Sequence, residues 1–186
     1  NHHASAISEL PDGTMVAVWY TGVEEKSVDS KLAWSKRAPQ AAKWTAPVVL
    51  YDDPAHSEGN PTFFVDEAGA YYVFHATIIG AGWDSAEIRL LKSRDQGISW
   101  DPIVVLVPPE KHFNVRHRPL VMDNGAWLLP LYNESLAIPV FLRSKDRFAT
   151  WSIDASLPNS GTFLVNHSGQ IQPALISQGG AKVAAL

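Results

Sequence analysis

The sequence contains no cysteine among its 186 residues, which excludes a disulfide framework and a zinc site built on thiolates. Charged residues are also few, at 18% of the chain, and the net charge is -4. No basic stretch is long enough to follow a phosphate backbone, so nucleic acid is not an expected partner. No apolar run approaches the roughly 20 residues that a membrane span requires. With 46% hydrophobic residues, the composition instead predicts a globular domain with a well-buried core.

The first residues lack the charged-then-apolar plan of a signal peptide. Since many exported bacterial proteins also lack cysteine, a secreted or periplasmic location is compatible with the sequence, and the compartment stays open. The seven histidines do not stand at the spacings of a metal site. We therefore expect neither a metal nor another cofactor.

An internal repeat of about one propeller blade organises the chain. Its landmarks are glycines in turns, separated by 56, 56 and 55 residues, and a tryptophan later in each unit. These residues are Gly13, Gly69, Gly125 and Gly180, and Trp44, Trp100 and Trp151. Each unit has the pattern of four strands with a tight turn after the first and another after the third, which predicts a four-stranded antiparallel sheet. We expect a single all-β domain with blades at residues 1–52, 58–108 and 116–158, and the start of a fourth blade at 170–186.

Three and a half blades do not close a ring. An open propeller leaves two sheet edges with unpaired backbone groups, which invite aggregation. We therefore expect this chain to be part of a longer propeller. The alternative is a half-ring that pairs edge to edge with a second copy of the chain.

A turn motif with the pattern S-x-D-x-G-x-x-W runs from Ser93 to Trp100, and a weaker copy contains Ser144, Asp146 and Trp151. In such a turn the aspartate accepts hydrogen bonds from turn amides, the glycine takes an unusual backbone angle, and the tryptophan packs beneath. The motif resembles the Asp-box of the sialidase-like (neuraminidase) BNR repeat family. That resemblance implies a six-bladed β-propeller, and it reports a fold more than an activity.

Strand direction alternates within a blade, so the loops between second and third strands share one face with the loops between blades. Function is more often carried by such loops on a rigid scaffold. The first of them, from Gly22 to Ser30, holds Glu24, Glu25 and Asp29. Paired carboxylates are what glycoside hydrolysis requires, which makes Glu25 and Asp29 candidate catalytic residues. The alternative is a solvated acidic loop with Lys26 as its local partner.

Positive charge is concentrated directly before an inner strand of the third blade, at Arg116 and Arg118. A guanidinium group binds a carboxylate through two parallel hydrogen bonds, so both are candidate substrate-binding residues. Arg118 stands in an X-Pro pair, as Asn60 and Gln172 do. We expect these three residues to converge near the propeller axis, and we rank Arg118 above Arg116. The alternative is an ordinary surface pair, or an arginine that pairs with the acidic loop.

Three further candidates lie in or beside loops of the same face. Trp83 stands in a glycine-containing loop, where its ring could stack on a sugar. Tyr132 and Glu134 end a later strand, and we expect Tyr132 to contact substrate and Glu134 to be catalytic. Packing against a neighbouring blade is the alternative for Trp83 and Tyr132.

For sialidases, the resemblance implies hydrolysis of a terminal sialic acid by a tyrosine nucleophile with a glutamate, an aspartate acid/base, and three arginines on the sugar carboxylate. The acid/base position falls in the loop that holds Glu25 and Asp29. Where the first clamp arginine is expected, this chain has His3-Ala4-Ser5, so that arginine is absent and His3 is the candidate there. No carboxylate stands near Gln170 to Gln172, where the partner glutamate would fall. The nucleophile and the other arginines would lie beyond Leu186.

The sequence thus predicts a carbohydrate-active protein, a glycoside hydrolase acting on sialic acid or another terminal acidic sugar. One alternative is a non-catalytic glycan-binding propeller, for which aromatic loops and an arginine suffice. The other is a polysaccharide lyase, which needs a histidine or tyrosine base beside a cation. A hydrolase needs two carboxylates that face each other across a pocket.

Overall fold

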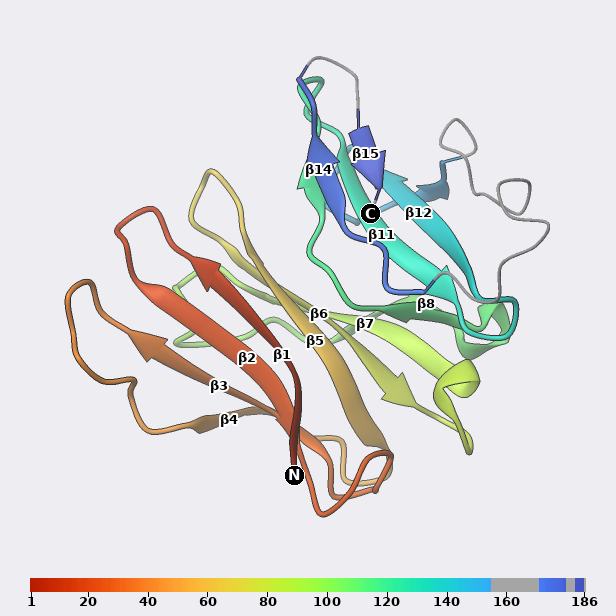
Figure 1. Cartoon of the computed structure of the whole chain (residues 1–186), viewed down its shortest axis with the longest axis horizontal. Coiled ribbons are helices and arrows are strands. Elements are labelled where there is room, and N and C mark those ends of the chain that lie inside the picture. The colour runs from red at the N-terminus through yellow and green to blue at the C-terminus, as the bar shows by residue number, and fades with distance from the viewer. Residues whose placement is uncertain (155–170, 180–182, 186) are drawn as a thin grey trace.

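Four consecutive antiparallel sheets follow one another along the chain in a computed structural model, which describes residues 1–154, 171–179 and 183–185 (Figure 1). The first sheet contains β1 (His2–Glu9), β2 (Met15–Thr21), β3 (Lys31–Arg37) and β4 (Val48–Tyr51). The second contains β5 (Ser57–Val65), β6 (Tyr71–Ile78), β7 (Ala86–Ser93) and β8 (Val104–Val107). The third contains β9 (Phe113–Val115), β10 (Leu120–Val121), β11 (Trp127–Asn133), β12 (Ile138–Ser144) and β13 (Ser152–Ile153). The fourth pairs β14 (Leu175–Ser177) with β15 (Val183–Ala185).

This architecture confirms the predicted fold class, a partial β-propeller built from four-stranded antiparallel blades. The third sheet has a fifth strand because β9 and β10 both pair with β11, which interrupts its inner strand at residues 116–119. Residues 155–158 of the third expected blade, and residues 170, 180–182 and 186 of the fourth, lie outside the described residues. The described helices are the short η1 (Trp83–Ser85) and η2 (Pro109–Lys111), and none is long and apolar enough to cross a bilayer.

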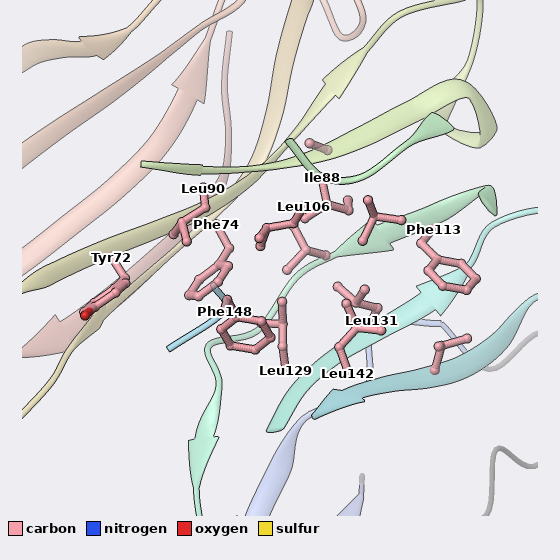
Figure 2. Close-up of a cluster of buried hydrophobic side chains, with 14 of the residues drawn as sticks. Tyr72, Phe74, Ile88, Leu90, Leu106, Phe113, Leu129, Leu131, Leu142 and Phe148 are labelled. Atoms are coloured by element: carbon pink, nitrogen blue, oxygen red, sulfur yellow. The ribbon is translucent and has the colours of Figure 1, made fainter. Parts of the chain in front are cut away.

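The second sheet is buried on both faces because it lies between the first and the third. Alternate residues of a strand point to opposite faces, and every residue of β6 is buried. Tyr71 and Val73 pack into a core shared with the first sheet, whereas Tyr72 and Phe74 pack into a core shared with the third. Figure 2 shows the second of these cores, with Phe74 beside Phe148. The run of aromatic and aliphatic residues in β6 therefore follows from its central position.

The turn at Asp95 is held by a dense set of hydrogen bonds. The carboxylate of Asp95 accepts hydrogen bonds from the backbone amide and hydroxyl of Ser99 and from the hydroxyl of Ser93. The hydroxyl of Ser99 is the main cause that lowers the pKa of Asp95 to about 2. Gly97 takes φ +86°, and the ring of Trp34 from the first sheet lies against it. The turn thus fastens the second blade to the first.

The third-blade copy of this turn has Phe148 where glycine is expected, and the backbone there is still left-handed, at φ 65°. Its amide donates a hydrogen bond to Ser144, as Gly97 does to Ser93. The ring is 3% exposed and packs edge-on against Phe74, with ring centroids 5.3 Å apart. Burial of a large ring therefore offsets a backbone conformation that side chains disfavour.

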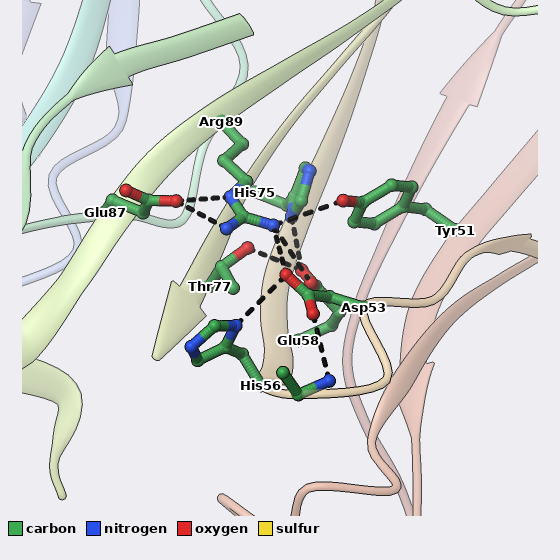
Figure 3. A network of polar contacts seen from close by, with 9 residues as sticks. Tyr51, Asp53, His56, Glu58, His75, Thr77, Glu87 and Arg89 are labelled. Carbon is green, nitrogen blue, oxygen red and sulfur yellow. Dashed lines mark hydrogen bonds and ion pairs between the residues drawn. The ribbon is translucent and has the colours of Figure 1, made fainter. Parts of the chain in front are cut away.

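A polar network around Arg89 joins the end of the first blade to the second sheet (Figure 3). The guanidinium donates to Asp53 at 2.8 Å, to Glu87 at 2.5 Å and to the hydroxyl of Tyr51 at 3.1 Å. Burial opposes ionisation of Asp53, but hydrogen bonds from Arg89, the backbone amide of Ala55 and His56 outweigh it and lower the pKa of Asp53 to about 2. The network fixes the loop between the two blades with paired charges.

Candidate functional site

A cavity of about 370 Å³ opens where the loops between second and third strands meet the inner strands. We call it the face cavity. Each of the three blades contributes a loop residue: Glu25 follows β2, Trp83 follows β6, and Glu134 follows β11. The lining residues are His3, Ala4, Tyr20, Glu25, Asn60, Trp83, Arg116, Tyr132, Glu134, Ile171 and Gln172.

Backbone irregularities in the inner strands direct residues towards this cavity. The register of β1 shifts between His3 and Ala6, and that of β5 shifts between Gly59 and Thr62. Within the second bulge Asn60 is left-handed at φ 46°, a conformation that asparagine tolerates better than most residues. The bulges break the strict alternation of the strands, which re-aims side chains at the site.

Trp83 forms one wall of the face cavity and is held on three sides. Its indole N–H donates a hydrogen bond to Glu25 Oε1 at 2.7 Å. Its ring lies edge-on to Tyr20, with centroids 6.2 Å apart, and directly against the backbone of Gly59. Trp83 is therefore both packed against neighbouring blades and exposed to the cavity, so the two sequence interpretations of it are compatible.

Arg116 brings a half-buried positive charge into the cavity. Its guanidinium donates a hydrogen bond to the carbonyl of Ala4 at 3.2 Å, across the inner strands. Within residues 1–154, 171–179 and 183–185, Arg116 forms no ion pair with a carboxylate. Burial lowers the pKa of Arg116, which shows that the surroundings disfavour its charge. A half-buried cation without a protein counterion is suited to binding an anion.

Tyr132 and Glu134 interact with each other in the same cavity. Burial is the main cause that raises the pKa of Tyr132, and the Glu134 carboxylate adds to the effect. Burial also raises the pKa of Glu134, and the charge of Asp84 acts in the same direction, while hydrogen bonds from Tyr132 and Asn114 oppose them. The Oε2 atom of Glu134 is buried without a hydrogen-bond partner. Glu134 therefore holds a proton more readily than an exposed glutamate, as a general acid should.

Eight of the ten predicted site residues line the face cavity. They are His3, Glu25, Asn60, Trp83, Arg116, Tyr132, Glu134 and Gln172. Asp29 does not line it, and its carboxylate accepts hydrogen bonds from the backbone amide of Val23. A hydrogen bond from Ser27 is the main cause that lowers the pKa of Asp29. Asp29 closes the loop that presents Glu25, so we assign it no catalytic role.

Arg118 also lies outside the face cavity, so Asn60, Arg118 and Gln172 do not all line one cavity, although Gln172 lines a cavity with each of the other two. Arg116 takes the place beside Asn60 and Gln172. Arg118 lines a neighbouring cavity of about 410 Å³ between the inner strands. The X-Pro pair of the third blade stands two residues later in the repeat than those of the second and fourth, and it falls in the break between β9 and β10.

Tyr20 is the main cavity residue that the sequence interpretation missed. Burial raises the pKa of Tyr20 to about 12, and the charge of Glu25 adds to the effect. A usable signal existed, because Tyr20 and Tyr132 stand two repeat lengths apart and end equivalent strands. The same interval of 56 residues links Ala4, Asn60, Arg116 and Gln172, all of which line the face cavity.

No group of three histidine or acidic side chains that could hold a metal ion occurs among the residues that the structure describes. The site therefore offers carboxylates, a guanidinium, phenols and an indole. These groups can bind a polar anionic ligand and transfer protons.

The family model described as a BNR repeat-like domain matches residues 13–186 of the chain. No curated protein sequence matches this chain. Among solved structures, the intramolecular trans-sialidase from Ruminococcus gnavus in complex with oseltamivir carboxylate is 11% identical and has a TM-score of 0.78. That match covers 100% of this chain and 65% of the other.

Two further structures cover all of this chain. The leech intramolecular trans-sialidase complexed with 2,7-anhydro-Neu5Ac is 12% identical and has a TM-score of 0.77. That match covers 47% of the leech protein. Trypanosoma rangeli sialidase in complex with 2,3-difluorosialic acid is 16% identical, with a TM-score of 0.73 over 34% of its length. The chain thus spans less than two thirds of the length of these proteins, and at such identities the likeness establishes the fold.

Proposed function

The chain belongs to the family of BNR repeat-like domains, and from this premise we propose that its face cavity binds a terminal acidic sugar and hydrolyses its glycosidic bond. The observation that carries the proposal is the meeting of Arg116, Glu25 and Glu134 in one cavity. Sialic acid is the first sugar to test, because the structural relatives are sialidases.

Binding rests on charge and on aromatic surface. The guanidinium of Arg116 can donate two hydrogen bonds to the carboxylate of the sugar, which supplies a counterion that the described residues do not. The ring of Trp83 offers an apolar wall for the sugar ring. Asn60, Gln172 and His3 add polar contacts around the ligand.

Glu134 and Glu25 have different roles in the proposed reaction. Glu134, whose pKa burial raises, donates its proton to the glycosidic oxygen as the bond to the anomeric carbon breaks. The carboxylate of Glu25 stabilises the positive charge that develops on the sugar and then takes a proton from the attacking water. The Trp83 indole N–H fixes the orientation of Glu25 for this role.

Lyase chemistry fits the cavity less well. Tyr20 and Tyr132 both lie near Arg116, so a tyrosine beside a cation is present. A lyase base has to accept a proton, however, and burial raises the pKa of both phenols. Both are protonated at neutral pH, which argues against either tyrosine as a lyase base.

The test combines binding with turnover. We would titrate the protein with N-acetylneuraminic acid by calorimetry and follow release of methylumbelliferone from its α-sialoside. We expect Arg116→Gln to weaken binding at least tenfold, because a charge-assisted hydrogen bond is lost. We expect Glu134→Gln to keep binding and to lower kcat by roughly 10²–10⁴. Arg94→Gln, at an exposed arginine of the Asp95 turn, is the matched control.

The outcomes separate the alternatives. Binding that needs Arg116 without any turnover would identify a glycan-binding propeller. Binding that is unchanged in Arg116→Gln would contradict the proposed site itself.

A further inference from the structure

The cavity that contains Arg118 is distinct from the face cavity and has a different character. We call it the inner-strand cavity, since residues 5–8 of β1 and Thr62 and Phe63 of β5 form its walls. Arg116, His117 and Arg118 complete it, together with Gln172. Among the residues that the structure describes, no aspartate or glutamate lines it, although the chain as a whole carries a net charge of -4. The cavity is therefore a local concentration of positive charge.

The arginines of this cavity differ from most others in the chain. Arg89, Arg94, Arg143 and Arg147 each form ion pairs with carboxylates. Arg118, like Arg116, forms none with the residues that the structure describes. Arg116 is half-buried and Arg118 is exposed, so both guanidinium groups have N–H donors available to an anion. Their placement in one cavity is suited to a ligand with negative charge.

The remaining polar groups are neutral donors of hydrogen bonds. Burial lowers the pKa of His117, and the charge of Arg116 adds to the effect, so the ring is neutral at pH 7 and keeps one N–H. The hydroxyls of Ser5 and Thr62 line the same cavity. Carboxylate and sulfate groups accept several hydrogen bonds at once, which matches this combination of two cations and three neutral donors.

Arg116 and Gln172 line both cavities, so the two cavities are direct neighbours. We propose that the inner-strand cavity is an oxyanion subsite that holds a second carboxylate or sulfate of the ligand. The ligand class is then an acidic sugar with two anionic groups, such as an acidic disaccharide or a sulfated acidic sugar. The oxyanion subsite stands on Arg118 and its neighbours, whereas the identity of the ligand rests on the function proposed above.

Two measurements test this subsite. In the first, sodium sulfate is added at constant ionic strength while the guanidinium Nε–H signals are followed by NMR, with chloride as reference. We expect a saturable shift of the Arg118 signal with sulfate and none with chloride. In the second, calorimetry compares N-acetylneuraminic acid with its α2,8-linked dimer for the wild type, Arg118→Gln, Arg118→Lys and the control Arg94→Gln.

We expect the wild type to bind the dimer about tenfold more tightly than the monomer, since one charge-assisted contact is added. Arg118→Gln should remove this advantage and leave the monomer affinity unchanged, and Arg118→Lys should keep part of it. The subsite is refuted if sulfate leaves the Arg118 signal unshifted, or if Arg118→Gln affects both sugars equally. A sulfate shift at Arg118 without binding of either sugar would support the oxyanion subsite and overturn the function proposed for the face cavity.

Discussion

Gly59 underlies the position of Trp83, and a single methyl group there should displace the ring. A Cβ atom on Gly59 would stand 2.3 Å from Cη2 and 2.6 Å from Cζ3 of Trp83. Carbon atoms in contact lie about 3.5 Å apart or more, so the indole has to move by about 1 Å. The ring cannot move freely, because its N–H is bonded to Glu25 and its edge packs on Tyr20.

We expect Gly59→Ala to lower the free energy of unfolding by about 1–3 kcal/mol, the usual range for an overpacked site. In a Trp83→Ala background the same change should cost close to zero, because the obstructing ring atoms are gone. The coupling energy between the two substitutions should therefore be about 1–3 kcal/mol, within the range seen for residues in contact. Displacement of Trp83 should also weaken sugar binding, although Gly59 itself has no side chain to contact a ligand.

Urea denaturation of the wild type, both single variants and the double variant gives the four free energies needed. Because the chain has seven tryptophans, the fluorescence change caused by Gly59→Ala in the wild type is compared with that in the Trp83→Ala background, and the difference reports on the Trp83 indole. Equal destabilisation by Gly59→Ala in both backgrounds would refute the reasoning, because it would show that Trp83 does not rest on Gly59.

Three further predictions concern stability. Glu134→Gln should stabilise the protein at pH 7 and have little effect at pH 4. The pKa of Glu134 is higher in the folded state than in the unfolded state, so the folded protein loses stability as the pH rises through the folded-state pKa. Glutamine cannot ionise, so the variant avoids this loss. Thermal denaturation at both pH values checks this, and an equal change at both would contradict it. Gly97→Ala should lower the free energy of unfolding by about 1–3 kcal/mol more than Gly69→Ala does. Both glycines have positive φ, but only a Cβ atom at Gly97 would meet a ring, at 2.2 Å from Cη2 of Trp34. Urea denaturation of the two variants measures the difference, and equal costs would argue against this packing. Phe148→Ala should cost about 3–5 kcal/mol by the same assay, because it empties the core between the second and third sheets while leaving the strained backbone angle in place.

The repeat made the fold predictable, because period and turn chemistry are local properties of the sequence. The turn around Asp95 needs only side chains within a few residues of one another, and the structure shows the expected hydrogen bonds. The replacement of the turn glycine by Phe148 does not disrupt the third blade, since the Phe148 ring is held by a core that forms between blades. That compensation depends on residues 74 and 127 of other strands, so no local pattern reveals it.

The sequence predicted which residues line the face cavity better than it predicted how they are arranged there. Strand alternation placed the right loops on one face, and so it identified Glu25, Trp83 and Glu134. It could not decide which of Arg116 and Arg118 lines the face cavity, because the X-Pro pair of the third blade stands two residues later in the repeat, in the break between β9 and β10. The interval of 56 residues was the better guide, since it follows the bulge that aims side chains at the cavity.

The contrast between the two ends of the blades explains why the motif that reveals the family is not the site. The tight turns and the Asp95 turn meet on one side, where Gln96 lies near Asp12 and Gly69. There the polar groups are satisfied, as the hydrogen bonds to Asp95 show. At the face cavity Arg116 has no counterion among the described residues, and Glu134 Oε2 is buried without a partner. A cavity that joins a cation without a carboxylate partner to a carboxyl group of raised pKa can bind a ligand and transfer a proton to it, so the physical argument for function points to the face cavity.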